Sequence, residues 1–210
     1  STGVLLYGDL CTVNRGLDET DNGQYDELEE VFGPYGAAAL FRRSLLKELG
    51  GFDEDYFLMH EEDDLAWRAR FLGWKCMYIP SAVVLHRRST RLGVYSATKL
   101  YYSERNRLWN VVKYLPVSLI IAAVALSGYR YYRLARLRFG RNSAKPRKVQ
   151  GLTTASVVKS LARAWVDAMI GLPRVVRQRH RIWQRRKVSN AQIAYWLTKF
   201  SAQISDVTEK

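Results

Sequence analysis

Charge is divided unevenly along this 210-residue chain. Residues 1–80 hold 7 Lys and Arg against 16 Asp and Glu, a balance of 7 − 16 = −9. Residues 81–210 hold 26 against 4, a balance of 26 − 4 = +22. A basic segment of this strength favours an anionic partner, either nucleic acid or an acidic membrane surface. We therefore interpret the two halves separately.

The two cysteines, Cys11 and Cys76, match neither a disulfide framework nor a metal-ligand spacing, which favours a reducing compartment. The chain starts at Ser1 without an initiator methionine or a signal peptide. Its first residues resemble the interior of a longer sequence, so we expect an N-terminal portion to precede Ser1.

The acidic half predicts short strands mixed with short helices, which is typical of an α/β layer. The expected elements are a buried strand over 36–41, a helix over 42–49 closed by Gly50 or Gly51, a second helix over 62–72, and strands over 75–79 and 82–86. We assign residues 1–97 to this first part.

The basic half, residues 98–210, predicts amphipathic helices. The first of them should end at Pro116, and Ser189 with Gln192 forms a capping box at the start of the last one. Sixteen residues without a charge, 114–129, would form a helix about 24 Å long at ~1.5 Å per residue, short of the ~30 Å hydrocarbon core. An interfacial, re-entrant or buried segment is therefore favoured over a full span. The arginines that follow alternate with tyrosines, which suits a membrane boundary. They are Arg130, Arg133, Arg136 and Arg138.

Four consecutive carboxylates, Glu61 to Asp64, stand at the start of the second predicted helix. Side chains at 61 and 64 would share one helix face, whereas Glu62 would point elsewhere. Mutual repulsion can raise the pKa of one member toward a value suited to base catalysis. An acidic helix start that only caps and solubilises is the simpler interpretation, and these four residues alone favour it.

The surrounding sequence changes this balance. The stretch "VFGPYGAAALFRRSLLKELGGFDEDYFLMHEEDDLAWRARFLGWKCMYIPSAVVLHRRS" resembles the inverting family-2 glycosyltransferases with the GT-A fold, especially bacterial rhamnosyl- and galactofuranosyltransferases. The resemblance covers residues 1 to about 115, and the basic tail is similar to the helical C-terminal extension of the same group. It implies the C-terminal part of a GT-A domain followed by a membrane-associated helical region.

The resemblance also implies roles for individual residues. The second acid of the family's pair falls on Glu62, which would be the general base, with Glu61 as the alternative. Asp64, the acid before Leu65, would contribute to substrate binding. His60, which lies beside the acids, could assist acceptor binding, but a partly exposed neighbour without that role is the favoured interpretation. Gly36 and Ala37 would let a sugar approach the backbone, or would simply pack in a strand.

A strand-end histidine, His86, would join a divalent ion, Mg or Mn, that holds the donor diphosphate. A surface residue without a ligand role is an equally good interpretation of His86. Arg87 or Arg88 could instead pair with the diphosphate oxygens directly.

Together these features predict an enzyme that transfers a sugar from a nucleotide-diphosphate donor, with inversion, to a hydroxyl of a cell-envelope or lipid-linked glycan. The Asp-x-Asp half of the family would precede Ser1, so we expect this segment alone to be inactive. An anionic membrane surface explains the basic tail better than nucleic acid does, which predicts peripheral attachment to the cytoplasmic face of a bacterial membrane. The alternative is a non-catalytic membrane-surface or nucleic-acid-binding module.

Overall fold

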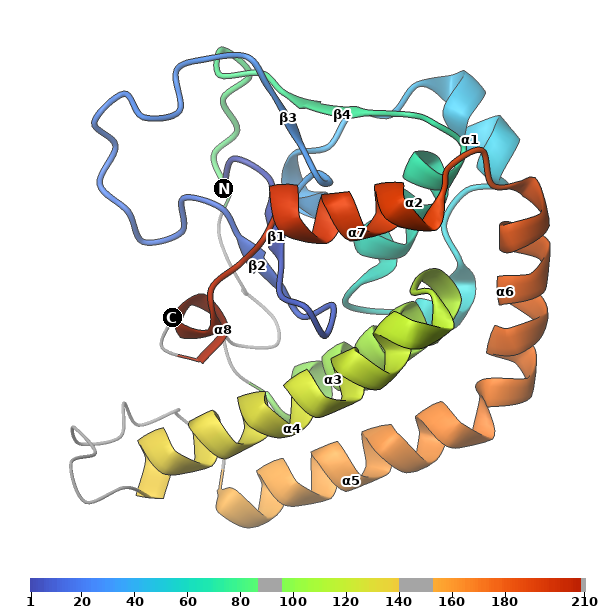
Figure 1. The fold of residues 1–210 in the computed structure, drawn as a ribbon. Coiled ribbons are helices and arrows are strands. Elements are labelled where there is room, and N and C mark those ends of the chain that lie inside the picture. The colour runs from blue at the N-terminus through green and yellow to red at the C-terminus, as the bar shows by residue number, and fades with distance from the viewer. Residues whose placement is uncertain (87–95, 140–152, 209–210) are drawn as a thin grey trace.

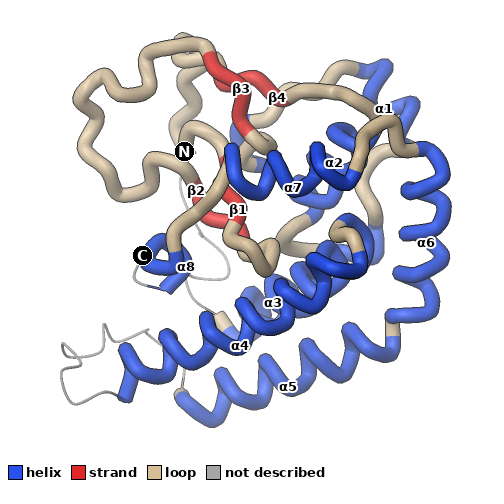
Figure 2. The backbone as a smooth tube through the Cα atoms, in the orientation of Figure 1, coloured by secondary structure: helices blue, strands red, loops and turns tan. Residues whose placement is uncertain are grey.

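The computed structural model describes residues 1–86, 96–139 and 153–208. Within these ranges the chain is mostly helical, and its strands form two separate antiparallel pairs (Figures 1 and 2). The strands are β1 (Val4–Leu6) paired with β2 (Thr12–Asn14), and β3 (Glu29–Val31) paired with β4 (Cys76–Tyr78). The helices are α1 (Arg43–Leu49), α2 (Glu61–Phe71), α3 (Ala97–Tyr114), α4 (Val117–Phe139), α5 (Thr154–Ile170), α6 (Leu172–Arg185), α7 (Asn190–Lys199) and α8 (Ile204–Thr208), with short 3-10 turns η1 (Gly36–Ala38) and η2 (Glu54–Tyr56).

Several local predictions are confirmed. Helix α1 ends at Gly50, which adopts a left-handed conformation with φ 76° and donates its backbone N–H to the Leu46 carbonyl. Helix α3 stops just before Pro116, whose ring cannot continue a helix. The predicted capping residue Ser189 accepts a hydrogen bond from the Gln192 backbone N–H at 3.1 Å, at the start of α7.

Two predicted strands are wrong. Residues 36–41 begin with η1 and continue as an extended segment in which Leu40 is fully exposed. Residues 82–86 have no regular structure, and Leu85 is 97% exposed. Among the described residues, no strand pairs with either segment, so their apolar side chains are not covered by a sheet neighbour.

The main hydrophobic core is centred on α2 and includes side chains from both predicted parts of the chain. The Trp67 ring lies parallel to the Tyr114 ring of α3, with centroids 5.4 Å apart, and meets the Trp196 ring of α7 edge-on. In addition, the backbone of Leu6 bonds to Phe200 and Ala202. Residues on both sides of position 97 thus contribute to this core.

Helix α4 contains most of the uncharged stretch and has one face packed on the protein, where Ala123 and Ser127 are buried. The other face is open to solvent, with Ile121 and Val124 exposed. In the described part of the chain, no helix combines the length and the apolar character needed to cross a bilayer.

A buried ionic cluster joins α4 to α3 and to the turn between β1 and β2. Arg130 Nε donates to Asp9 Oδ2 at 2.8 Å, and Arg130 Nη2 donates to Glu104 Oε2 at 3.1 Å. Arg107 also donates to Glu104 and lies 3.4 Å from Asp9. The expectation that Arg130 belongs to a membrane boundary is therefore wrong, because this guanidinium is needed inside to balance two buried carboxylates.

These contacts predict a stability that depends on acidity. Burial alone would raise the pKa of Glu104, but Arg107 and Arg130 outweigh it and lower that pKa from 4.5 to about 2. A lowered carboxyl pKa contributes stability that is present above the unfolded-state value, ~4.3, and is lost as pH falls toward about 2. Glu104→Gln should therefore unfold more easily at pH 7, by ~3–5 kcal/mol, because the buried guanidinium groups of Arg107 and Arg130 are left with Asp9 as their one shared carboxylate.

Urea denaturation at pH 7, 4.5 and 3 measures this effect, and the deficit of Glu104→Gln should shrink at the lowest pH. The matched control is Glu27→Gln, which alters an exposed acid in the loop before β3. Equal stability of the two variants at pH 7 would contradict the structural role of the cluster.

Candidate active site

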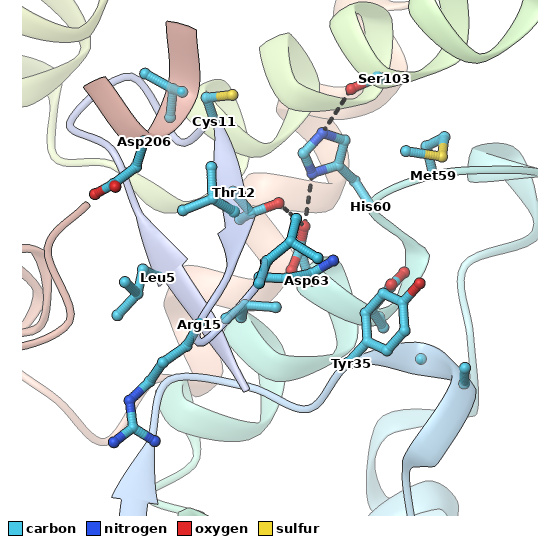
Figure 3. Close-up of a pocket in the computed structure, with 18 of the residues that line it drawn as sticks. Leu5, Cys11, Thr12, Arg15, Tyr35, Met59, His60, Asp63, Ser103 and Asp206 are labelled. Carbon is cyan, nitrogen blue, oxygen red and sulfur yellow. Dashed lines mark hydrogen bonds and ion pairs between the residues drawn. The ribbon is translucent and has the colours of Figure 1, made fainter. Parts of the chain in front are cut away.

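A pocket of about 740 Å³ opens beside the N-terminal end of α2 (Figure 3). One wall is the β1–β2 hairpin, a second is the segment that includes Tyr35 and Gly36, and α3 and α8 contribute Ser103 and Asp206. The first turn of α2 places Glu61, Glu62 and Asp63 in the pocket lining. The pocket thus collects residues from segments far apart in the sequence around a group of carboxylates.

Glu61 and Glu62 face this pocket with unused hydrogen-bonding capacity. The Oε2 atom of each is buried and has no hydrogen-bond partner among the described residues. A Cβ atom added at Gly36 would lie only 3.1 Å from Glu62 Oε1, so the glycine gives this carboxylate the space it occupies. A buried oxygen without a protein partner at a pocket wall is available to accept a hydrogen bond from a ligand.

The surroundings of Glu62 change its acidity. Burial, followed by the negative charges of Asp63 and Glu61, raises the pKa of Glu62 from 4.5 to about 7. A carboxyl group with such a pKa exchanges its proton near neutral pH, which is the property required of a general base or acid. Among the described residues, Glu62 combines a place in the pocket lining, a buried oxygen without a hydrogen-bond partner and this raised pKa.

His60 precedes α2 in a left-handed conformation, with φ 66°. Its Nδ1 donates to Asp63 Oδ2 at 2.6 Å, and its Nε2 lies 3.2 Å from Ser103 Oγ (Figure 3). Thr12 Oγ1 donates to the same Asp63 oxygen at 2.9 Å. Burial lowers the pKa of His60, but the hydrogen bond and charge of Asp63 outweigh this and raise it.

This arrangement fixes the His60 ring at the edge of the pocket, because both ring nitrogens have protein neighbours. The favoured interpretation of His60 as a partly exposed neighbour is wrong, since this residue is only 6% exposed. Sequence reasoning gave Asp63 no role, although its position three residues after His60 was the available signal.

Asp64 does not lie where the sequence prediction placed it. It is fully buried, and its Oδ1 accepts from Lys113 Nζ at 2.9 Å and from Tyr114 Oη at 2.5 Å. Its Oδ2 accepts from Arg68 Nε at 2.8 Å. Asp64 therefore holds α2 against α3 and does not line the pocket, so the expected substrate contact is replaced by ion pairs.

Three further predicted residues that the structure describes lie in the pocket wall. Gly36 and Ala37 line it, as does His86, which is exposed and has its ring 5.6 Å from that of Tyr35. Arg87 and Arg88 lie outside the described residues.

The described residues do not form a metal site by themselves. Across residues 1–86, 96–139 and 153–208, no three His, Cys, Asp or Glu side chains are grouped closely enough to hold an ion. His86 would supply a single ligand, which is fewer than Mg or Mn takes from its surroundings. The expected metal therefore stays a prediction from the resemblance.

The sequence is partly similar to known glycosyltransferases. It is 35% identical over 83 residues to an N-acetylglucosaminyl-diphospho-decaprenol L-rhamnosyltransferase of Mycobacterium tuberculosis, a match that covers 35% of this chain and 27% of that protein. It is 40% identical over 68 residues to a pre-mycofactocin glycosyltransferase of the same organism, covering 31% of this chain and 14% of that protein.

The matched part is thus about a quarter or less of the length of these relatives. No protein-family model matches the chain, and no solved structure matches it. The chain therefore has a distant and partial similarity to glycosyltransferases, including one whose name specifies a lipid-linked acceptor.

The environment of Glu62 predicts an unusual stability effect. Because its carboxyl pKa is raised when folded, wild type loses stability as pH rises from the unfolded-state value, ~4.3, to about 7. Glu62→Gln removes the buried charge, so its melting temperature should exceed that of wild type at pH 8, with a smaller difference at pH 5. Thermal unfolding by circular dichroism at both values measures this difference.

Asp64→Asn is the matched control, because it changes a nearby acid whose charge is compensated. It should lower the melting temperature at both pH values by leaving Lys113 and Arg68 without their buried partner. A Glu62→Gln variant that is less stable than wild type at pH 8 would show that this carboxylate has a structural partner.

Proposed function

We propose that this chain supplies the catalytic-base side of an inverting glycosyltransferase. The donor would be a nucleotide-diphosphate sugar, and the acceptor a hydroxyl of a cell-envelope or lipid-linked glycan. The observation that carries the proposal is Glu62, a pocket carboxylate with an unpartnered oxygen and a pKa of about 7. The partial similarity to two glycosyltransferases supports the reaction class.

In the proposed reaction, Glu62 removes the proton from the acceptor hydroxyl as that oxygen attacks the anomeric carbon of the donor sugar. The new carbon–oxygen bond forms as the bond to the diphosphate breaks, and the electron pair of the broken bond leaves with the nucleotide diphosphate. Attack from the face opposite the leaving group inverts the anomeric configuration. The proton ends on Glu62 and passes to solvent after the product departs.

The neighbouring residues would support this step in different ways. Glu61 contributes negative charge that raises the proton affinity of Glu62, and Gly36 leaves room for the carboxylate beside the backbone. The His60–Asp63 pair holds the first turn of α2 against Thr12 and Ser103, which fixes the direction in which Glu62 points. A lipid-linked acceptor would place the reaction at the cytoplasmic face of a bacterial membrane.

The base role is tested by substitution in the polypeptide encoded by the complete gene. Glu62→Gln should lower sugar transfer by ~10²–10⁴, because the amide cannot accept the proton. Donor affinity should change little, since Glu62 is proposed to act on the acceptor. Transfer is measured with a panel of UDP-, GDP- and dTDP-sugars, and binding of the active donor by calorimetry.

Glu61→Gln is the matched control, since it makes the same chemical change one residue away in the same pocket. It should retain most activity. Normal turnover in Glu62→Gln would remove the base role from this residue, and loss of turnover only in Glu61→Gln would assign that role to Glu61.

The acidity of Glu62 also predicts a pH profile for wild type. The ionised carboxylate is the active form, so kcat/KM should rise tenfold per pH unit below about 7 and level off above it. Initial rates between pH 5 and 9 measure the profile. In Glu61→Gln the midpoint should move to lower pH, because one of the charges that raises the Glu62 pKa has been removed. An inflection close to the ordinary glutamate value, ~4.3, in wild type would contradict the proposed environment.

A further inference from the structure

The outward face of α4 carries an apolar strip that no part of the described structure covers. Val117, Ile121 and Val124 are 69%, 71% and 53% exposed, and Tyr132 continues the same helical face. The sequence from Val117 to Tyr129 contains no charged residue. Soluble monomeric proteins rarely expose a contiguous apolar strip along several helical turns. This face of α4 is therefore suited to an apolar partner.

Helix α5 carries a second set of exposed apolar side chains. Its exposed members are Val158, Val166, Met169 and Ile170. The two helices are in contact, because Trp165 Nε1 of α5 donates to Tyr131 Oη of α4 at 3.3 Å. In Figure 1 both helices run along the lower part of the molecule, with α5 below α4. We call the combined surface of these α4 and α5 residues the α4–α5 face.

The part of the sequence that contains α4, α5 and α6 carries almost entirely positive charge. Between positions 117 and 187, Asp167 is the only acidic residue in the sequence, whereas Lys and Arg number 17. Exposed cations occur on all three helices of this region. They include Arg136 on α4, Lys159 and Arg163 on α5, and Arg177 and Arg181 on α6.

We propose that the α4–α5 face docks on an anionic lipid bilayer, with its apolar side chains at the acyl boundary and the surrounding arginines and lysines among the headgroups. Apolar burial and attraction to anionic lipid are the two contributions that bind interfacial helices, and this surface offers both. In this arrangement α4 and α5 lie along the bilayer surface, each with its packed face turned toward the protein.

Charge and apolar exposure together favour an anionic bilayer over two other partners, a second copy of the chain and a nucleic acid. A second copy of the chain would bring two strongly positive surfaces together, and like charges across an interface oppose association. A nucleic acid would use the cations but would leave the apolar side chains of both helices exposed to water. An anionic bilayer satisfies the charge and the apolar side chains together.

The proposed docking places the pocket close to lipid. Helix α4 contacts α8, and α8 contributes Asp206 to the pocket wall. If the proposed function is correct, the acceptor bound there can keep its lipid in the bilayer. The docking itself does not depend on the chemistry at Glu62, and Glu62→Gln should bind vesicles as wild type does.

Vesicle flotation tests the proposal with the 210-residue chain. Wild type should float with vesicles of phosphatidylcholine mixed with phosphatidylglycerol, and much less with phosphatidylcholine alone. Ile121→Ser combined with Val124→Ser should weaken binding at least ~tenfold, because it removes exposed apolar groups without altering the core. Arg177→Gln combined with Arg181→Gln should reduce binding about fivefold per arginine at low salt, and less at high salt.

The matched control is Leu28→Ser combined with Leu40→Ser, which removes two exposed apolar side chains from the acidic half. It should float as wild type does, and circular dichroism confirms that each variant folds. Failure of wild type to bind anionic vesicles would overturn the proposal. So would a stable dimer in light scattering that dissociates in the Ile121 and Val124 variant, or RNA binding in a gel shift without vesicle binding.

Discussion

The buried contacts of Asp64 are the constraint on which the rest of the site depends. This carboxylate is fully excluded from water, and Lys113, Arg68 and Tyr114 satisfy its two oxygens. Lys113 also binds Asp53 at 2.7 Å, which extends the contact to the turn before α2. An isolated buried carboxylate would be very costly, so α2 can pack against α3 only in the register that brings these partners to Asp64.

The register in which α2 packs against α3 also sets the surroundings of the other three acids, Glu61, Glu62 and Asp63. With Asp64 directed inward, Asp63 reaches His60 and Thr12, while Glu61 and Glu62 remain at the pocket with an unpartnered oxygen each. Four adjacent carboxylates thus occupy three environments. Two of them are compensated by partners, and the repulsion that remains falls on Glu62, whose pKa rises because burial and its acidic neighbours outweigh the opposing charge of His60. The clustering that first suggests a solvated helix start is what produces a proton acceptor near neutral pH.

The sequence predicted α1, α2, α3 and the α7 cap, because each depends on local signals such as glycine, proline and a capping serine. It predicted Glu62 from the resemblance and not from spacing. It could not predict that Asp64 is buried with Lys113, 49 residues away, nor that Arg130 turns inward to Asp9, which is 121 residues distant. The strands expected over 36–41 and 82–86 failed for a related reason. An apolar run becomes a strand only when a neighbour supplies hydrogen bonds, and none of the described segments does so.

Helix α4 shows that one uncharged stretch can pack one face on the core and leave the other face exposed. Its inner face carries Arg130, which bonds to Asp9 in the turn between β1 and β2, and Gly8 in the same turn lies against the Leu126 side chain. Strand β2 leads from this turn to Thr12, which holds Asp63 at the pocket. The outer face of α4 is therefore connected to the pocket wall through a short series of buried contacts. Because buried ion pairs with few alternatives transmit displacement instead of absorbing it, a bilayer that fixes the outer face would also fix the β1–β2 hairpin beside Glu62.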